Sequence, residues 1–350
     1  MTPALHQALC RRPAPLIAVV AALAFAAPLP GGAAETVNLY SSRQESLIKP
    51  LLDRFTGQTG IVVNLVTGKD DALLQRLRSE GLNSPADVLM TADAGRLYRA
   101  KAAGSTQAIR SPELEAAIPS SYRDPDGHWF GLSVRARPIL YVKDKVDPAT
   151  LSTYEALAHP AFRGRICIRS SDNIYNQSLV ASMIAANGAE AAETWARGLV
   201  ANLARPPKGG DRDQIKAAAA GECDIAIANT YYLAGMLQSD DPAEKSAAQA
   251  MGVFWPDQDG RGVHVNISGA AVTAGAKHKE AAIRLIEFLA SPESQQWYAE
   301  TNGEYPVREG VEVSALLAGW GPFKPDPVDL NLLGKLNGDA LRLMDRAGWR

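Results

Sequence analysis

The stretch "ETVNLYSSRQESLIKPLLDRFTGQTGIVVNLVTG", residues 35–68, holds two different periodicities. The short runs of apolar and β-branched residues at its two ends are typical of strands. Between them, apolar residues recur at helical spacing as far as Gly60, and glycine is a common residue at the C-terminus of a helix. A strand, a helix and a strand in this order predict a βαβ unit, in which the two strands run parallel.

The alternation continues beyond this stretch, with a helical pattern at 69–81, a strand at 86–92 and another helical pattern at 93–104. Three strands that alternate with three helices predict an α/β fold with a largely parallel sheet covered by helices. A β-rich run that contains Pro138 follows at 124–144, and a second α/β pattern begins after it. In an exported chain, two such lobes joined by a long strand predict a hinged clamp with a ligand in the cleft.

The first 34 residues have the composition of a secretory signal peptide. They contain Arg11 and Arg12, then a short apolar stretch, then small residues that end at Ala34. We expect cleavage before Glu35 and export to the periplasm. The apolar stretch is too short to span a membrane comfortably, and no other segment could. Removal of the two arginines lowers the net charge from −2 to −4, so nothing indicates binding to nucleic acid or to a membrane surface.

Two cysteines remain in the mature chain. Cys167 and Cys223 both lie in strand-like runs, "RICIRS" and "ECDIAIAN". An exported protein with two cysteines can form one disulfide, and the alternative is a pair of buried free thiols. The sequence sets no distance between them, so both alternatives stay open.

The expected topology places three stretches at the cleft. Ligands on such sheets bind beyond the carboxyl ends of strands, near helix N-termini. The stretches at these positions are 40–45, 170–177 and 229–232. None of the common hydrolase, metalloprotease or phosphate-binding motifs occurs in the chain.

Tyrosines are prominent in two of these stretches: Tyr175 in "SSDNIYNQS", and Tyr231 and Tyr232 after "AIAN". A phenol has a pKa of about 10, and a bound trivalent cation can displace its proton. Three phenolates would balance the charge of Fe(III), whereas zinc would call for His or Cys and calcium for clustered carboxylates. The alternative is that the tyrosines are half-buried, with hydroxyls bonded to the backbone.

The stretch "YSSRQES" ends a strand and opens a helix. The helix N-terminus, Ser42 and Arg43 form a candidate site for a small anion such as carbonate, which could complete the coordination of a ferric ion. A surface salt bridge is the alternative role for Arg43. Ser42-x-x-Glu45 matches a capping box, which is the structural alternative for Glu45.

Six segments resemble the periplasmic ferric-iron-binding proteins of ABC iron-uptake systems: "VNLYSSRQESLIKPLLDRF", "PADVLMTADAGRL", "GLSVRARPILYV", "RSSDNIYNQSLVASMI", "GECDIAIANTYYL" and "NISGAAVTAGAKHKEAAIRLIEFLASPESQQ". The likeness covers essentially the whole mature chain, and the tandem tyrosines and "NIYNQS" are its most specific parts. It implies a type II periplasmic-binding-protein (clamshell) fold, with each lobe a mostly parallel sheet flanked by helices and with hinge strands between the lobes. It also implies that Tyr175, Tyr231 and Tyr232 bind Fe(III).

The resemblance is incomplete on the first lobe. One branch of the family has iron-ligating His-Tyr where this chain has Gln44-Glu45, and another branch uses a Glu whose equivalent here is Ala92. The chain is therefore most similar to the branch with three tyrosines and a synergistic carbonate. Glu45, with Gln44 beside it, is the alternative ligand. Arg135 in "SVRAR" is expected to help hold the anion or, alternatively, to form a hinge salt bridge.

The resemblance implies a receptor, not an enzyme: a monomer that captures Fe(III) and delivers it to an inner-membrane ABC permease. Lobe 1 is expected at 35–134, completed by about 264–305, and lobe 2 at 135–263, completed by about 306–350. One alternative is the same scaffold with another small solute, such as a polyamine or an oxyanion. A second is an exported enzyme with a tyrosine base, which would need a group that lowers the pKa of that tyrosine.

Overall fold

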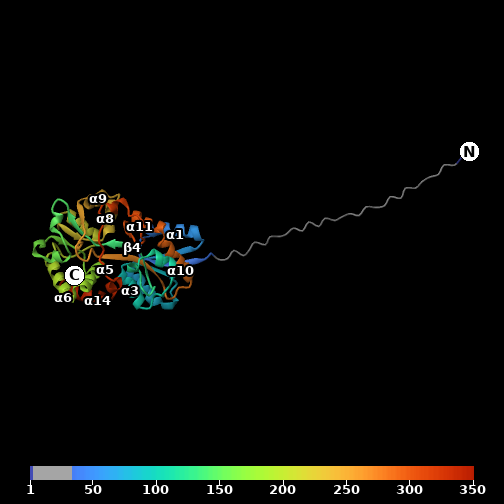
Figure 1. Cartoon of the computed structure of the whole chain (residues 1–350), viewed down its shortest axis with the longest axis horizontal. Helices are drawn as coiled ribbons and strands as arrows, with labels where there is room; N and C mark the ends of the chain where they lie inside the picture. The colour runs from blue at the N-terminus through green and yellow to red at the C-terminus, as the bar shows by residue number, and fades with distance from the viewer. Residues whose placement is uncertain (3–33) are drawn as a thin grey trace. The chain divides into compact units, whose positions relative to one another are not determined.

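The computed structural model describes residues 1–2 and 34–350, so the predicted signal peptide lies almost entirely outside the described residues. From Glu35 to Arg350 the chain forms one unit that contains two β-sheets (Figure 1). The six-stranded sheet has the order β10-β4-β9-β3-β1-β2, with β1 (Thr36–Ser41), β2 (Val62–Thr67), β3 (Val88–Ala92), β4 (Phe130–Ala136), β9 (Val265–Val272) and β10 (Tyr305–Pro306). The four-stranded sheet has the order β6-β7-β5-β8, with β5 (Ile139–Val142), β6 (Ile166–Cys167), β7 (Ile225–Ile227) and β8 (Met251–Phe254).

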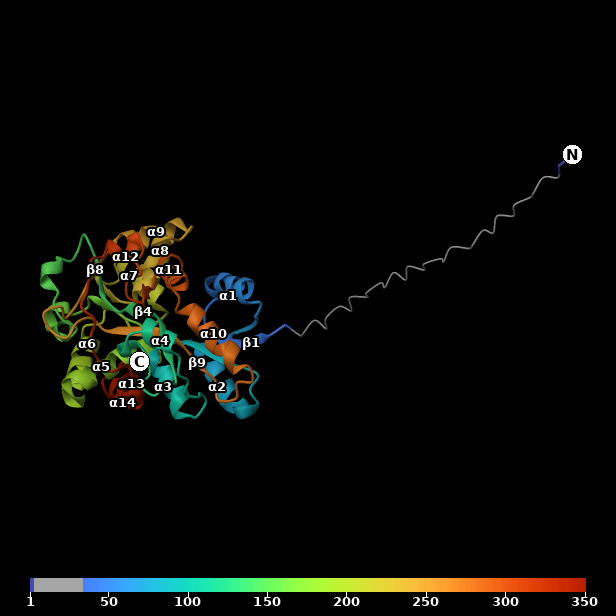
Figure 2. The same ribbon diagram turned by 45° about the vertical axis from the view of Figure 1, so that its right-hand side comes forward.

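Helices cover both sheets (Figure 2). In chain order the α-helices are α1 (Glu45–Thr59), α2 (Asp70–Glu80), α3 (Ala94–Ala102), α4 (Pro112–Ala117), α5 (Ile174–Asn187), α6 (Ala189–Ala201), α7 (Asp211–Ala219), α8 (Thr230–Leu237), α9 (Pro242–Gln249), α10 (Lys279–Leu289), α11 (Pro292–Thr301), α12 (Ala315–Ala318), α13 (Leu330–Lys335) and α14 (Asn337–Arg346). Helices α7, α8 and α9 contact one another beside the smaller sheet, whereas α13 packs against both α3 and α5. No helix in the described part of the chain is both long and apolar enough to cross a bilayer.

The predicted βαβ unit at the start of the mature chain is confirmed. Strands β1 and β2 pair in parallel, and α1 connects them. The helix buries one face, formed by Ile48, Leu51, Leu52 and Phe55, which explains the helical spacing of these residues. It ends at Gly60, whose φ of 74° is a left-handed conformation that glycine adopts without a steric penalty.

Both sheets are mixed, although most strands in each run in one direction, as expected. In the larger sheet, β3 pairs in parallel with β1, but β9 is antiparallel to both β3 and β4. In the smaller sheet, β6 and β7 are parallel, whereas β5 is antiparallel to β7 and β8. Strands β5 and β9 each follow a strand of the other sheet. Each of them runs opposite to the parallel strands of the sheet that it joins, whereas β4, which is antiparallel to β9, runs in the same direction as β3.

The β-rich run around Pro138 is two strands rather than one. Strand β4 belongs to the larger sheet and β5 to the smaller sheet, and Arg137 and Pro138 connect them. The second connection runs from β8 back to β9 and ends at His264. The two connections meet where the backbone N–H of Arg137 donates to the carbonyl of His264, at 3.0 Å. The sheet membership of these strands is clear, while the expected lobe boundaries stay a prediction.

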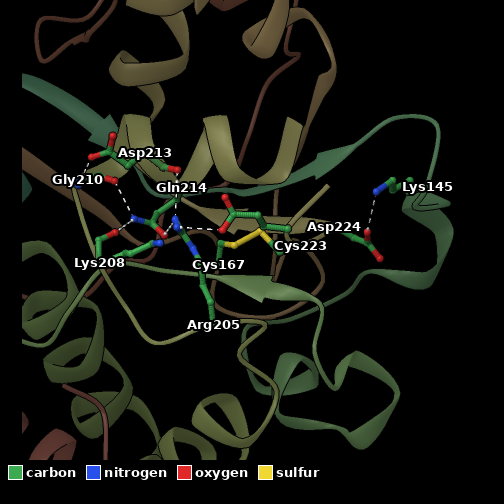
Figure 3. Close-up of a disulfide and its surroundings, with 10 residues drawn as sticks. Lys145, Cys167, Arg205, Lys208, Gly210, Asp213, Gln214, Cys223 and Asp224 are labelled. Atoms are coloured by element: carbon green, nitrogen blue, oxygen red, sulfur yellow. Dashed lines mark hydrogen bonds and ion pairs between the residues drawn. A yellow bond between two sulfur atoms is a disulfide. The ribbon is translucent and has the colours of Figure 1, made fainter. Parts of the chain in front are cut away.

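The question of the two cysteines is settled in favour of a disulfide (Figure 3). The Cα atoms of Cys167 and Cys223 are 6.0 Å apart, and both residues are buried. Cys167 ends β6 and Cys223 lies just before β7, so the bond joins two neighbouring parallel strands. Each of these strands leads into one of the tyrosine-bearing stretches.

Candidate metal site

The three tyrosines of the predicted site lie together. Tyr175 is the second residue of α5, and Tyr231 and Tyr232 are the second and third residues of α8. The Tyr231 hydroxyl donates to the Tyr175 hydroxyl, at 3.1 Å. The rings of Tyr231 and Tyr232 lie 4.2 Å apart between centroids. The turn from β7 into α8 therefore lets two adjacent phenols face the same space, which neither a continuous strand nor a continuous core helix would allow.

The phenols line a cavity of about 620 Å³ between elements of the two sheets. Three arginines and two carboxylates also line it, so guanidinium groups outnumber carboxylates at its wall. These charged residues are Arg43, Arg135, Arg212, Asp70 and Glu304. Uncharged polar residues complete much of the lining: Ser42, Gln44, Thr91, Ser268 and Asn302.

Burial affects the protonation of two of the phenols at this cavity, Tyr175 and Tyr231. Burial raises the pKa of Tyr175, and its phenolate would also be repelled by a Tyr232 phenolate, although Arg135 acts in the opposite direction. Burial likewise raises the pKa of Tyr231 well above its usual range. The guanidinium of Arg135 lies 5.4 Å from the centre of the Tyr175 ring, and that of Arg169 lies 5.8 Å from it. Both cations would stabilise a phenolate once a metal displaced the proton.

Arg43 is paired inside the cavity wall. Its Nη2 donates to Glu304 Oε2 at 2.5 Å and to Ser133 Oγ at 3.0 Å, and its guanidinium lies 5.0 Å from the centre of the Tyr298 ring. The side chains of this ion pair are 11% and 5% exposed, so the alternative of a surface salt bridge is wrong. Burial alone would lower the pKa of Arg43, but Glu304 outweighs it and the pKa is raised, so Arg43 stays cationic.

Arg135 reaches the cavity from β4. It donates to Ser268 Oγ and to the Ile267 carbonyl, both at 2.8 Å. Within residues 34–350, no carboxylate lies within ion-pair distance of Arg135, so the alternative of a hinge salt bridge is wrong for the described structure. Its charge is therefore not neutralised by direct contact.

The residues at the start of α1 divide into two groups. Ser42, Arg43 and Gln44 line the cavity, but Glu45 is exposed and does not. Helix α1 begins at Glu45 with Gln44 as its N-cap, and no side chain caps it. The predicted capping box of Ser42 and Glu45 is therefore wrong, because the helix begins two residues later than the motif requires.

Several residues of the cavity wall were missed by the sequence reasoning. Asp70 opens α2, where its Oδ1 accepts hydrogen bonds from Thr91 Oγ1 at 2.6 Å and from the Ala92 N–H at 3.0 Å. It follows β2, so the end-of-strand rule that located the other stretches could have found it. Glu304 had no such signal, since it lies in the loop between α11 and β10. The described residues contain no group of three His, Cys, Asp or Glu side chains arranged to hold a metal.

Comparisons with known proteins identify similar chains. A family model described as a bacterial extracellular solute-binding protein matches residues 51–321. Iron uptake protein A1 of Synechocystis sp. is 50% identical over 319 residues, which cover 91% of this chain and 89% of that protein. The Fe(3+)-binding periplasmic protein of Serratia marcescens is 28% identical over 96% of this chain and 97% of its own length.

Solved structures agree with the sequence comparisons. A Trichodesmium protein described as in complex with iron and citrate ligands superposes with a TM-score of 0.88 and 53% identity, and the match covers 90% of this chain and all of that one. A ferric binding protein from Campylobacter jejuni superposes with a TM-score of 0.86 and 39% identity over the same shares. The predicted two-lobed fold is thereby confirmed.

Proposed function

Because the chain belongs to the bacterial extracellular solute-binding protein family, we propose that it captures Fe(III) in the cavity between its two sheets and takes part in iron uptake. The observation that carries this proposal is the convergence of Tyr175, Tyr231 and Tyr232 on one cavity. The iron uptake and ferric-iron-binding names of similar proteins support the same function. The protein is a binding protein and not an enzyme.

The three tyrosines act as phenolate ligands in this proposal. Their combined charge of −3 would neutralise Fe(III), whereas a site that held Fe(II) would keep an excess negative charge. The metal must displace protons from phenols whose pKa values are raised by burial, as for Tyr175 and Tyr231. Arg135 and Arg169, which lie near the Tyr175 ring, offset part of that cost.

A small anion completes the coordination in this proposal. Arg43 and Arg135 line the cavity, and the Nε atom of each is buried without a hydrogen-bond partner in the described part of the chain. Buried donors without partners are costly, and a carbonate or another small carboxylate would satisfy them. Ser42 and Gln44 line the same wall and would contact the anion or a bound water. The citrate in the Trichodesmium structure supports an anion of this general class.

The wider role follows from the family. We propose that the chain is exported to the periplasm, works as a monomer and passes Fe(III) to an inner-membrane ABC permease.

The two alternative functions, a receptor for another solute and an enzyme with a tyrosine base, are less well supported. A polyamine would meet three arginines in the cavity wall. A tyrosine base would need a lowered pKa, yet burial raises the pKa of both Tyr175 and Tyr231.

The experiment that tests the function is a visible absorption spectrum of the purified mature protein with one equivalent of Fe(III). Phenolate-to-iron charge transfer should colour the complex, and citrate at mildly acidic pH should bleach it. A stoichiometric ferric complex without a visible band would refute the phenolate ligands. Tight binding of an oxyanion or a polyamine, with no binding of iron, would refute the function itself.

A further inference from the structure

The two helices that carry the tyrosines share one buried guanidinium. Arg137 lies outside the cavity of the metal site, between β4 and β5, and is 1% exposed. Its Nη1 donates to Asp211 Oδ1 at 2.8 Å and to Asn229 Oδ1 at 2.9 Å. Its Nη2 donates to Asn176 Oδ1 at 2.7 Å. The two asparagines belong to different helices, and each is close in sequence to a proposed ligand.

Asn229 holds the start of α8. It is the N-cap residue, and Tyr231 and Tyr232 follow within the first turn. An N-cap asparagine ordinarily accepts a hydrogen bond from the first turn of its own helix. Here the side chain makes no such bond and instead accepts from Arg137. The position of the tandem tyrosines is therefore tied to the guanidinium rather than to a local cap.

Asn176 holds the start of α5. It follows Tyr175 directly, and its Nδ2 donates to the carbonyls of Arg169 at 2.7 Å and Ser170 at 3.1 Å. This side chain therefore ties the loop before α5 to the helix, while its Oδ1 accepts from Arg137. The Asn176 side chain thus links Arg137 to the loop before α5 as well as to the first turn of α5.

Asp211 closes the network. Its Oδ1 accepts from the backbone N–H of Asn229 at 3.2 Å as well as from Arg137. Its Oδ2 accepts from Arg169 Nη1 at 2.7 Å, and Arg169 is one of the two cations that lie over the Tyr175 ring. The Asp211 side chain is fully buried, so this single carboxylate connects the two tyrosine segments a second time.

The backbone of Arg137 lies at the crossing of the two connections between the sheets. Its N–H donates to the His264 carbonyl at 3.0 Å, and its carbonyl accepts from the Tyr154 hydroxyl at 2.7 Å. The same residue therefore contacts both connections through its backbone and both tyrosine helices through its side chain. A change in the path of these connections would move the guanidinium and, with it, the starts of α5 and α8.

We propose that Arg137 is a positioning residue for the metal site, which holds the helix starts of Tyr175 and of Tyr231 and Tyr232 in one geometry from the connection between the two sheets. The inference rests on the proposed function, since it assumes that these phenols bind Fe(III). Only a guanidinium can do this, because its planar fork offers several donors in fixed directions, whereas an ammonium is a single point of charge. Partners of metal ligands typically change metal affinity by about 10- to 100-fold when they are lost.

The test compares Arg137→Lys with Leu199→Ala, a truncation of a buried side chain in α6 that takes no part in these hydrogen bonds. Each purified variant is titrated with Fe(III), and its visible spectrum and thermal midpoint are recorded. We expect Arg137→Lys to bind iron about 10- to 100-fold more weakly, with a shifted charge-transfer maximum. Leu199→Ala should melt at a lower temperature but keep the affinity and the absorption maximum of the unmodified protein.

Two further variants decide the matter if Arg137→Lys does not fold. Asn176→Ala removes the link to Tyr175, and Asn229→Ala removes the link to the tandem tyrosines. Each should weaken iron binding and shift the maximum. Unchanged affinity and maximum in these variants would overturn the inference, as would an equal loss of affinity in Leu199→Ala. The proposed function fails separately, if the unmodified protein itself shows no phenolate band.

Discussion

Tyr231 is the most constrained of the three proposed ligands. Its hydroxyl is bonded to that of Tyr175, its ring packs against Tyr232, and burial raises its pKa. Because the ion needs an anionic oxygen from this position, we expect Tyr231→Phe to lower the affinity for Fe(III) by at least about 100-fold, more than the loss of an outer partner. Isothermal titration or competition with a chelator measures this.

A half-buried tyrosine outside the cavity provides the control for this substitution. Tyr305 does not line the cavity, and its hydroxyl has no hydrogen-bond partner in the described part of the chain. Tyr305→Phe should bind iron like the unmodified protein. If Tyr231→Phe also did so, the tyrosine would be structural and not a ligand.

Arg43 and Glu304 are expected to act in opposite directions on iron binding. Arg43→Ala should weaken binding by about 10- to 100-fold, because the proposed anion loses a cationic partner, and depletion of bicarbonate should weaken the unmodified protein in the same way. Glu304→Gln should not weaken it, since the substitution frees the guanidinium from its present partner. Titrations with and without bicarbonate measure both effects.

Glu45 is the matched control on the same segment. It is exposed and lies outside the cavity, so Glu45→Gln should leave the affinity unchanged. The opposite pattern would identify Glu45 as the ligand: affinity insensitive to bicarbonate and to Arg43→Ala, but abolished by Glu45→Gln.

At the scale of the elements, the short strands β6 and β7 are joined by the Cys167–Cys223 disulfide. Strand β6 contains only two residues and β7 three, so backbone pairing alone holds them weakly. The Cys167–Cys223 disulfide spans 56 residues, for which the chain-entropy account predicts about 4 kcal/mol of stabilisation. We expect the double variant Cys167→Ala, Cys223→Ala to unfold at a lower denaturant concentration by roughly that free energy.

The same variant should keep its iron chemistry when folded. Neither cysteine lines the cavity, so the visible band should be unchanged under conditions where the variant is native. An unchanged denaturation midpoint would contradict the assigned stabilising role of the bond.

For the whole molecule, we expect iron binding to be coupled to the release of protons. Burial raises the pKa values of Tyr175 and Tyr231, so these phenols are protonated in the free protein at neutral pH. Fe(III) must therefore displace up to about three protons, and affinity should fall steeply as the pH decreases. Titration in weakly buffered solution measures the protons released, and a release near zero would contradict phenolate coordination.

The amino-acid sequence alone determined the local elements and the chemistry of the proposed ligands. Helical spacing with Gly60 defined α1, and the strand patterns located β1, β2 and β3, because hydrophobic periodicity and turn residues act over a few neighbouring positions. The tyrosines were found because they follow strand ends, where ligands bind on such sheets. For the two cysteines, the sequence left a disulfide and a pair of free thiols as alternatives, because the number of residues between two cysteines does not determine the distance between them in the fold.

Only the tertiary structure showed which residues line the cavity and which residues bond to the segments that carry the tyrosines. Glu304 reaches Arg43 across 261 residues of sequence, and Arg137 reaches Asn229 across 92. No local pattern encodes such contacts, because they depend on how each sheet brings together strands that are distant in sequence. The mixed sheets also depend on the tertiary structure, since the direction of β5 and β9 follows from the path of the chain between the sheets and not from the composition of either strand.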